Sequence, residues 1–217
     1  MRVTYYVEIF SSWCYWAEPA WAELKAKYAG RVTFDWKIAL MNLEDFPETP
    51  EQCAWFYRRS GTVMRSPFML SPDWVEGGPR EVYRTPNLVA EAARELGAAG
   101  DEVRGALAHA AMREGRKVAR LDEAIAVAAA AGKLDPQALR ELAGSPRVME
   151  RVAASTAEFH AHRINQRPAF LLEDAIGDKA VFSGLVVAGP LSATIDAMLA
   201  DTTAYASYAV HHGKPPG

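Results

Sequence analysis

The pattern of apolar residues changes twice along the first forty positions. Residues 3–10 form an apolar run rich in Tyr, Val and Ile, which is typical of a strand. Residues 13–28 repeat apolar side chains at helical spacing and end before Gly30, and residues 32–40 return to a strand pattern. Because a helix of this length connects the two strands, we expect a βαβ unit in which the strands lie parallel.

The middle of the chain, from about residue 42 to residue 160, has an almost entirely helical pattern. Residues 62–84, which contain several Pro and Gly, interrupt this pattern and predict a loop that covers part of the fold. Apolar side chains at helical spacing mark three of the helices, and an N-cap residue followed by Pro marks the start of two more. These markers are Leu88, Ala92 and Leu96; Val103, Leu107 and Ala111; Leu121, Ile125 and Ala128; Asp135-Pro136; and Ser145-Pro146.

Strand patterns return after residue 160. Residues 168–173 and 179–184 flank Gly177-Asp178 and predict a β-hairpin, and residues 191–199 predict a last helix. The order βαβ, helices, ββα predicts one α/β domain interrupted by a helical one. The predicted division is an α/β domain of residues 1–41 and 161–201, a helical insertion of residues 42–160, and a C-terminal tail of residues 202–217, in which residues 211–217 are expected to fray.

Composition and charge exclude several classes of partner. The 217 residues are 50% hydrophobic and 24% charged with a net charge of -3, which is an ordinary globular balance. No basic face stands out, so we expect no nucleic-acid partner. The longest apolar runs are rich in alanine and too short to span a bilayer, so we expect no membrane partner.

Two observations favour the cytoplasm. The first six residues enter a strand pattern directly, without the apolar segment and cleavage site of a secretory signal. Cys14 and Cys53 are the only cysteines, so the chain does not build a disulfide framework. We therefore expect a cytoplasmic protein.

Three features stand at the joints between the predicted elements. Ser11-Ser12-Trp13-Cys14 lies between the first strand and first helix, Pro19 follows Cys14 by five residues, and Arg167-Pro168 opens the third strand. In this order the features resemble the DsbA-like branch of thioredoxin-fold proteins. There, a Cys-x-x-Cys motif, a helix-kinking proline and a cis-proline facing the active site occupy these places. The resemblance covers most of the chain and implies a thioredoxin fold with a large helical insertion.

The chain departs from this family at the first cysteine, which is Ser11 here. Cys14 aligns with the second, usually buried cysteine, so no disulfide can form between the two positions. The DsbA-like branch includes kappa-class glutathione transferases and 2-hydroxychromene-2-carboxylate isomerases, which carry Ser at this place and use glutathione. The resemblance thus implies a glutathione-dependent isomerase or transferase acting on a small hydrophobic or aromatic substrate.

Ser11 has two interpretations from the residues alone. It is either a helix N-cap, for which Ser12 is equally suited, or a donor to a thiolate that a ligand brings. A helix N-terminus stabilises an anion by about 0.3–1 kcal/mol, and its free NH groups point at the ligand. Together with the hydroxyl, these groups lower the pKa of a bound thiol from about 8.5 toward neutrality.

The cysteines have competing interpretations too. Cys14 is either a small buried apolar residue or a catalytic thiol acting alone, as in a one-cysteine thiol-disulfide oxidoreductase or a deglutathionylase. Cys53 has no visible partner, and we expect a core or surface helix residue. A third alternative for the whole chain is a thioredoxin-fold binding protein that has lost catalysis, with a pocket filled by its own side chains.

The resemblance also implies the remaining ligand contacts. A cis Pro168 exposes the backbone of Arg167 to pair with a peptide-like ligand, and the guanidinium of Arg167 either binds a carboxylate or points to solvent. In the glutathione-using relatives a polar pair at the start of the last helix holds the γ-glutamyl end of glutathione. That pair is missing here, which leaves the backbone NH groups of Gly184 and Leu185 as the candidate donors. The predicted glutathione-binding residues are Ser11, Ser12, Trp13, Arg167, Pro168, Gly184 and Leu185, and Ser11 and Cys14 are the catalytic candidates.

Other candidate groups are weaker. Aromatic residues gather near the predicted site, at Trp13, Tyr15, Trp16 and residues 55–57, and most are expected in the core. The histidines do not share a helix face and no Cys/His cluster occurs, so we expect no metal site. Relatives of the glutathione-using type are often dimers, which makes a homodimer one expected assembly.

Overall fold

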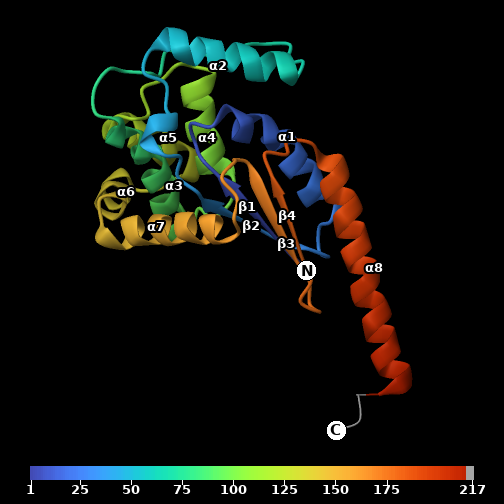
Figure 1. Ribbon diagram of the computed structural model, residues 1–217. Helices are drawn as coiled ribbons and strands as arrows, with labels where there is room; N and C mark the ends of the chain where they lie inside the picture. The colour runs from blue at the N-terminus through green and yellow to red at the C-terminus, as the bar shows by residue number, and fades with distance from the viewer. Residues whose placement is uncertain (214–217) are drawn as a thin grey trace.

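The computed structural model describes residues 1–213 and contains a four-stranded sheet in the order β2-β1-β3-β4 (Figure 1). Strand β1 pairs in parallel with β2, whereas β1 with β3 and β3 with β4 are antiparallel. The predicted βαβ unit and C-terminal hairpin are therefore confirmed. The strands are β1 (Arg2–Val7), β2 (Thr33–Ile38), β3 (Ala169–Glu173) and β4 (Lys179–Ser183).

Alternate residues of β1 pack against two different layers because successive side chains of a strand point to opposite faces of the sheet. Tyr5 faces the main core, where its ring lies 4.9 Å from Phe170 and 5.1 Å from Trp21 of α1. Tyr6 faces the opposite layer, where its ring lies 5.6 Å from that of Phe159 on α7. The sheet is thus covered on both faces.

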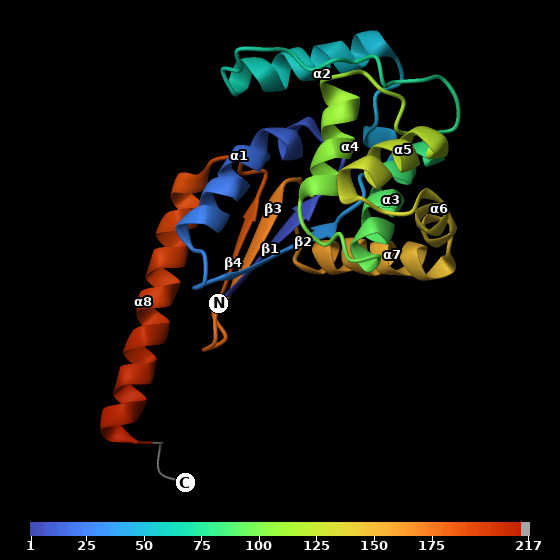
Figure 2. The same cartoon turned by 180° about the vertical axis from the view of Figure 1, so that it is seen from behind.

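Helices α1 (Ser12–Lys27) and α8 (Ala188–His212) lie side by side on one face, and α7 (Pro146–Ala161) crosses the other (Figures 1 and 2). The predicted proline inside the first helix is Pro19, and it lies within α1. Among the described residues, no helix has both the length and the apolar character needed to cross a bilayer.

The last helix is far longer than predicted. The apolar pattern indicates a helix over residues 191–199 and a tail from residue 202, with fraying from residue 211, but α8 continues to His212. The prediction is wrong for residues 202–212, because this stretch contains neither Gly nor Pro and includes several alanines that favour a helix. The rest of the predicted tail, residues 214–217, lies outside the described residues.

The predicted helical insertion packs beside the β2 edge of the sheet. Its loop before residue 85 ends in a 3₁₀ turn, η2 (Arg80–Arg84), and Asp135 and Ser145 cap α6 and α7 as the sequence predicts. A second 3₁₀ turn, η1 (Leu43–Asp45), follows β2. The remaining helices are α2 (Pro50–Val63), α3 (Thr85–Glu95), α4 (Glu102–Met112), α5 (Leu121–Gly132) and α6 (Pro136–Ala143).

A buried arginine joins the insertion to the α/β domain. Arg104 of α4 is 2% exposed and forms ion pairs with Glu18 of α1 and with Asp101, the latter at 2.6 Å. Its guanidinium lies 5.2 Å from the centre of the Tyr5 ring, which adds a cation–π contact. These acidic partners raise the pKa of Arg104 against the opposing effect of burial. The contact fixes α4 on the helix that begins at the candidate site.

Candidate functional site

The turn between β1 and α1 ends at Ser11. The strand stops at Val7, three residues before its predicted end, because the Ser11 NH donates to the Glu8 carbonyl at 3.1 Å and turns the chain. Ser11 has the extended backbone of an N-cap (φ -79°, ψ 112°), and its Oγ accepts from the Cys14 NH at 3.4 Å. Of the two serines, Ser11 is therefore the cap.

Two backbone donors remain free beside this cap. No acceptor for the NH groups of Ser12 and Trp13 lies among residues 1–213, as is usual for the first turn of a helix. Both residues are partly exposed, whereas Ser11 itself is 6% exposed. This end of a 16-residue helix therefore has the donors and the dipole that bind an anion.

Cys14 has the character of a buried structural thiol. Its side chain is 2% exposed, and burial raises its pKa to about 11, outweighing the opposing hydrogen bonds from Ser11 and the Glu8 backbone. Because a thiolate is the nucleophile in thiol chemistry, a thiol with so high a pKa is a weak attacking group at neutral pH. The geometry favours the interpretation of Cys14 as a core residue.

The Arg167-Pro168 peptide bond is cis, as predicted from the resemblance. The segment leading to it lies across a cavity of about 230 Å³ from the α1 turn. Pro168 is buried behind this wall at the start of β3. The structure thus brings together the two segments on which the predicted site depends. From the two sides the lining residues are Ser11, Ser12, Trp13, Asn165, Gln166 and Arg167.

The side chain of Arg167 takes neither of its predicted positions. It is 7% exposed and donates to the backbone carbonyls of Ala39 and Leu40, while its guanidinium lies 4.5 Å from the ring centre of Phe159. A further bond of 3.3 Å reaches the Asn165 carbonyl. The guanidinium therefore ties the end of β2 to the segment before Pro168.

Gly184 and Leu185, predicted to offer backbone NH groups to the ligand, do not line this cavity. The Gly184 NH donates to the Pro168 carbonyl at 2.7 Å because the β3–β4 ladder continues one step beyond β4. Neither residue lines the cavity, and neither do Ser192 or Thr194, the polar side chains at the start of α8. The cavity lining therefore includes no polar side chain from the start of α8.

The outer wall of the cavity comes from the insertion. Phe10 stacks on Trp74 of the 64–79 loop, with ring centres 4.1 Å apart. Phe56 and Tyr57 of α2 also line the cavity, and the guanidinium of Arg59 lies 5.3 Å from the Phe56 ring. Of the predicted aromatic cluster, Trp13, Phe56 and Tyr57 therefore line the cavity. Tyr15, Trp16 and Trp55 do not.

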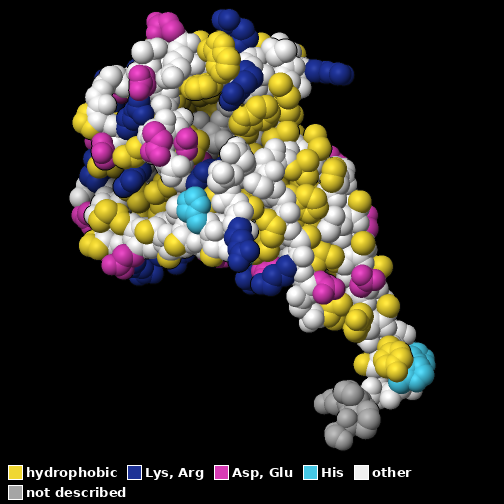
Figure 3. Space-filling model, viewed as in Figure 1, with side chains coloured by type: hydrophobic (Ala, Val, Ile, Leu, Met, Phe, Trp, Pro, Cys, Tyr) yellow, Lys and Arg dark blue, Asp and Glu magenta, His cyan; other side chains and the backbone are white. Residues whose placement is uncertain are grey.

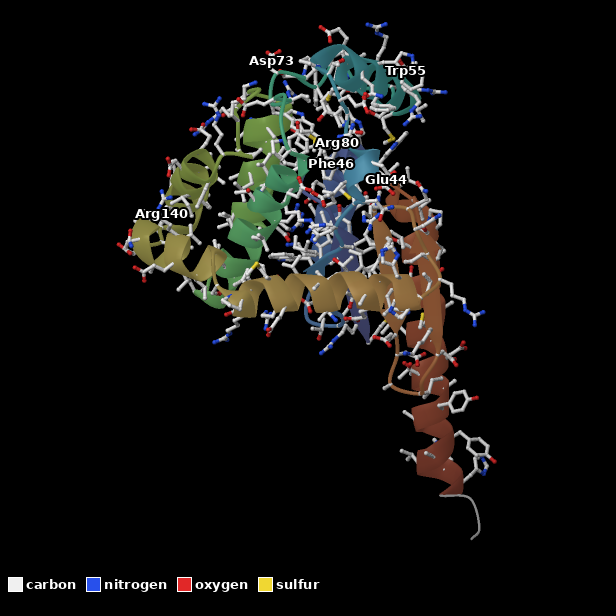
Figure 4. The ribbon with its side chains drawn as sticks, turned by 60° about the vertical axis from the view of Figure 1, so that its left-hand side comes forward. Glu44, Phe46, Trp55, Asp73, Arg80 and Arg140 are labelled. Atoms are coloured by element: carbon white, nitrogen blue, oxygen red, sulfur yellow. The ribbon has the colours of Figure 1, made fainter. Side chains whose placement is uncertain are left out.

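Other side chains near α2 lie away from the cavity or are unreactive. Trp55 is 55% exposed on the outer side of α2, whereas Phe46 and Arg80 lie deeper, beneath that helix (Figure 4). Cys53 lines the cavity but is 1% exposed, and burial raises its pKa to about 12. It is a buried residue of α2, one of the two positions expected for it.

A buried polar pair that the sequence analysis missed supports the turn. Glu8 is fully buried, and its carboxyl accepts hydrogen bonds from the Asn87 amide at 2.6 Å, the Met41 NH at 3.2 Å and the Phe10 NH at 3.3 Å. Asn87 in turn accepts from the Ile9 NH at 3.1 Å. The available signal was a single charged residue inside the apolar run 3–10. This pair fixes the backbone that leads to Ser11.

Comparison with solved structures identifies the fold. The sequence matches no family model and no curated protein. A putative protein disulfide isomerase from Nitrosomonas europaea has a similar structure, with a TM-score of 0.69, 16% identity and 98% of each chain covered. The cytosolic disulfide reductase DsbM from Pseudomonas aeruginosa, solved with GSH, has a TM-score of 0.66 and 18% identity over 95% of this chain and 100% of DsbM.

A third similar structure belongs to an isomerase. A 2-hydroxychromene-2-carboxylate isomerase has a TM-score of 0.58 and 14% identity, and the match covers 95% of this chain and 98% of that one. Within residues 1–213 there is no group of three or more His, Cys, Asp or Glu side chains able to hold a metal ion. The chain has the DsbA-like thioredoxin fold, with Ser11 at the start of the helix that faces the cis-proline.

Proposed function

We propose that this protein is a glutathione-dependent isomerase or transferase in which the N-terminus of α1 holds the sulfur of glutathione as a thiolate. Ser11 donates a hydrogen bond to the sulfur, and the NH groups of Ser12 and Trp13 add positive partial charge. The backbone of Arg167, before the cis-proline, pairs with the peptide part of the ligand. The chain then supplies no sulfur of its own to the reaction.

One observation carries this proposal: the first turn of α1, with its free NH groups, and residues 165–167, which lead to the cis-proline, line the same cavity. Cys14 is buried and has a raised pKa, so it is a poor nucleophile. This supports the proposal that the reacting sulfur comes from a bound ligand. The similar structure of DsbM was solved with GSH, which adds support from a protein of the same fold. Its description as cytosolic agrees with the cytoplasmic location that we expect.

The outer wall suggests the class of second substrate. Phe56 and Trp13 offer apolar surface, and Arg59 offers a positive charge at the same cavity. Asp45 also lines the cavity and balances part of that charge. These side chains suit a small hydrophobic or aromatic acid, which places its ring on the aromatic wall and its carboxylate near Arg59.

Titration calorimetry with reduced glutathione tests the proposal. We expect the unaltered protein to bind and Ser11→Ala to bind at least about tenfold more weakly, since a charge-assisted hydrogen bond contributes about 1.5–3 kcal/mol. Ser12→Ala is the matched control, because its NH, rather than its hydroxyl, is proposed to contact the sulfur. Equal binding by Ser11→Ala and the unaltered protein would remove Ser11 from the mechanism.

The alternative function is that of a thioredoxin-fold binding protein that has lost catalysis. It predicts no affinity for glutathione and a pocket filled by the chain's own side chains. The cavity of about 230 Å³ beside Ser11 favours the enzyme over this alternative. The calorimetric experiment decides between the two, since an absence of any glutathione binding favours the binding protein.

A further inference from the structure

The guanidinium of Arg167 is a buried positive charge with no carboxylate in contact. The side chain is 7% exposed, and its hydrogen bonds all go to backbone carbonyl oxygens, those of Ala39, Leu40 and Asn165. A guanidinium has five N–H donors, so some of them have no acceptor among residues 1–213. Within the same residues no Asp or Glu side chain forms an ion pair with Arg167. Its charge is therefore not neutralised by direct contact.

The other buried arginine of the described residues has acidic partners. Arg104 of α4 is 2% exposed and forms ion pairs with Glu18 and Asp101. Removing a charge from water is costly unless an opposite charge and hydrogen bonds compensate it. Arg104 has both, whereas Arg167 has only carbonyl oxygens and the ring of Phe159. A bound anion would supply the missing opposite charge.

Arg167 lies at the cavity where the sulfur of glutathione is proposed to bind. It lines that cavity together with Ser11, Ser12 and Trp13 of the α1 turn. Burial lowers the pKa of Arg167, and the Cys14 sulfur is among the groups whose charge opposes this effect. Because Cys14 follows Ser11 by about one helical turn, an anion held by Ser11 lies in the same electric field. The charge of Arg167 therefore acts on the place proposed for the external sulfur.

Two acidic side chains near Arg167 reduce this field without cancelling it. The charges of Glu8 and Asp45 also oppose the effect of burial on the pKa of Arg167. Glu8 is fully buried, which raises its own pKa and works against its ionisation. Asp45 is exposed, and its carboxylate accepts a hydrogen bond from the Asn42 amide at 3.2 Å. Because solvent screens an exposed carboxylate, we expect the field at the α1 turn to remain positive.

The other arginine of the cavity has a weaker effect on a bound sulfur. Arg59 of α2 lines the cavity but is exposed. On the face seen in Figure 3, Lys and Arg side chains over α2 project into solvent, and the surface beneath that helix is hollowed. Water and salt screen such charges, whereas a charge in the protein interior acts through a lower dielectric constant. The buried guanidinium of Arg167 is therefore the more effective cation.

We propose that the buried guanidinium of Arg167 is the positive charge that keeps the bound sulfur ionised. This inference rests on the proposed function, in which Arg167 contributes its backbone alone. When the thiol of glutathione releases its proton to water, the guanidinium stabilises through space the negative charge that remains on the sulfur. The guanidinium in turn gains the opposite charge that residues 1–213 do not supply by contact. Ser11 then orients the sulfur, and Arg167 stabilises its charge.

Calorimetry with two ligands at about pH 8 tests the proposal. The thiol of reduced glutathione can ionise, whereas S-methylglutathione has the same peptide and no ionisable thiol. We expect Arg167→Gln to bind glutathione at least about tenfold more weakly than the unaltered protein, because the thiolate loses the buried cation. Binding of S-methylglutathione should change by less than about threefold. The ratio of the two dissociation constants therefore reports the charge on the sulfur.

Arg167→Lys separates charge from structure. Lysine keeps the positive charge, but its ammonium cannot reproduce the planar set of bonds to the carbonyl oxygens. We expect both variants to be less stable in urea, while Arg167→Lys keeps the ratio of dissociation constants within about threefold of the unaltered protein. Should Arg167→Gln fail to fold, Arg167→Lys decides alone. A ratio that is kept supports the proposal, and a ratio that falls by about tenfold overturns it.

The outcomes distinguish this inference from the proposed function. A loss of glutathione binding in Arg167→Gln that neither S-methylglutathione nor Arg167→Lys shares supports the role of the guanidinium. Equal losses for both ligands, or for both variants, overturn that role and leave the proposed function intact. If the unaltered protein binds neither ligand, the proposed function fails and this inference fails with it.

Discussion

The amide of Asn87 donates a 2.6 Å hydrogen bond to the buried carboxyl of Glu8, three residues before Ser11. Asn87 lies on α3 of the insertion and Glu8 on the turn after β1, so the bond joins the two parts of the fold directly behind the candidate site. The same asparagine accepts from the Ile9 NH at 3.1 Å. The backbone that presents Ser11 is therefore held by the insertion.

Replacing this asparagine should destabilise the protein strongly. Asn87→Ala leaves the Ile9 NH without its acceptor and Glu8 without its shortest donor, and we expect a loss of about 2–4 kcal/mol in the free energy of unfolding. Asn42→Ala at an exposed position is the control, with a change within about 0.5 kcal/mol. Urea unfolding measures both. A loss for Asn87→Ala no larger than the control's contradicts a supporting role for the pair.

Glu8 should make stability depend on pH. Burial raises its pKa above the ordinary 4.5, against the opposing effects of its hydrogen bonds with Asn87, Met41 and Phe10. In the pH range between the two values the folded state retains a proton that the unfolded state releases, so stability falls as the pH rises through that range. Relative to Glu8→Gln, the unaltered protein should lose free energy of unfolding above pH 4.5. Parallel stability curves for the two proteins would refute a raised pKa.

Arg104 should contribute more to stability than an exposed arginine. Arg104→Ala removes the buried partner of Glu18 and Asp101, and we expect a loss of about 2–4 kcal/mol, reduced because both acids are about a quarter exposed and can hydrate. Arg140→Ala breaks an ion pair with Asp122, whose side chain is 88% exposed, and should change stability by less than about 0.5 kcal/mol. Urea midpoints that shift equally in both variants would contradict this difference.

Cys14 should react slowly with alkylating agents. With a pKa of about 11, only about one molecule in ten thousand carries the thiolate at pH 7, and the side chain is 2% exposed. Iodoacetamide labelling followed by mass spectrometry should therefore be slow in the folded protein and fast after unfolding in urea. Rapid labelling of the folded protein would instead favour single-cysteine thiol-disulfide chemistry at Cys14.

The sequence predicted the fold well where local signals agree. The apolar run that predicts the first strand, the caps at Asp135 and Ser145 and the Gly177-Asp178 turn are each determined by neighbouring residues. The structure confirms the caps and the turn, and it confirms the strand as far as Val7. The cis bond before Pro168 was predictable only because the resemblance assigned it a place. Long-range contacts without a local signal were not predictable.

Two long-range contacts and one helix end were not predicted. The side chain of Arg167 binds the carbonyls of Ala39 and Leu40, more than a hundred residues earlier, and nothing in its own neighbourhood indicates them. The Glu8–Asn87 bond likewise joins residues 79 apart. The length of α8 was missed because the apolar stripe weakens after Met198 while helix-forming residues continue.

The central claim is that the α1 turn holds an external thiolate, and the acidity of glutathione bound to the protein tests it most directly. A pH titration of thiolate absorbance, in the presence of saturating protein, should show the pKa of the glutathione thiol lowered by about one to two units, and less in Ser11→Ala. A bound thiol that titrates as it does in free solution, or equally in both proteins, would contradict the account.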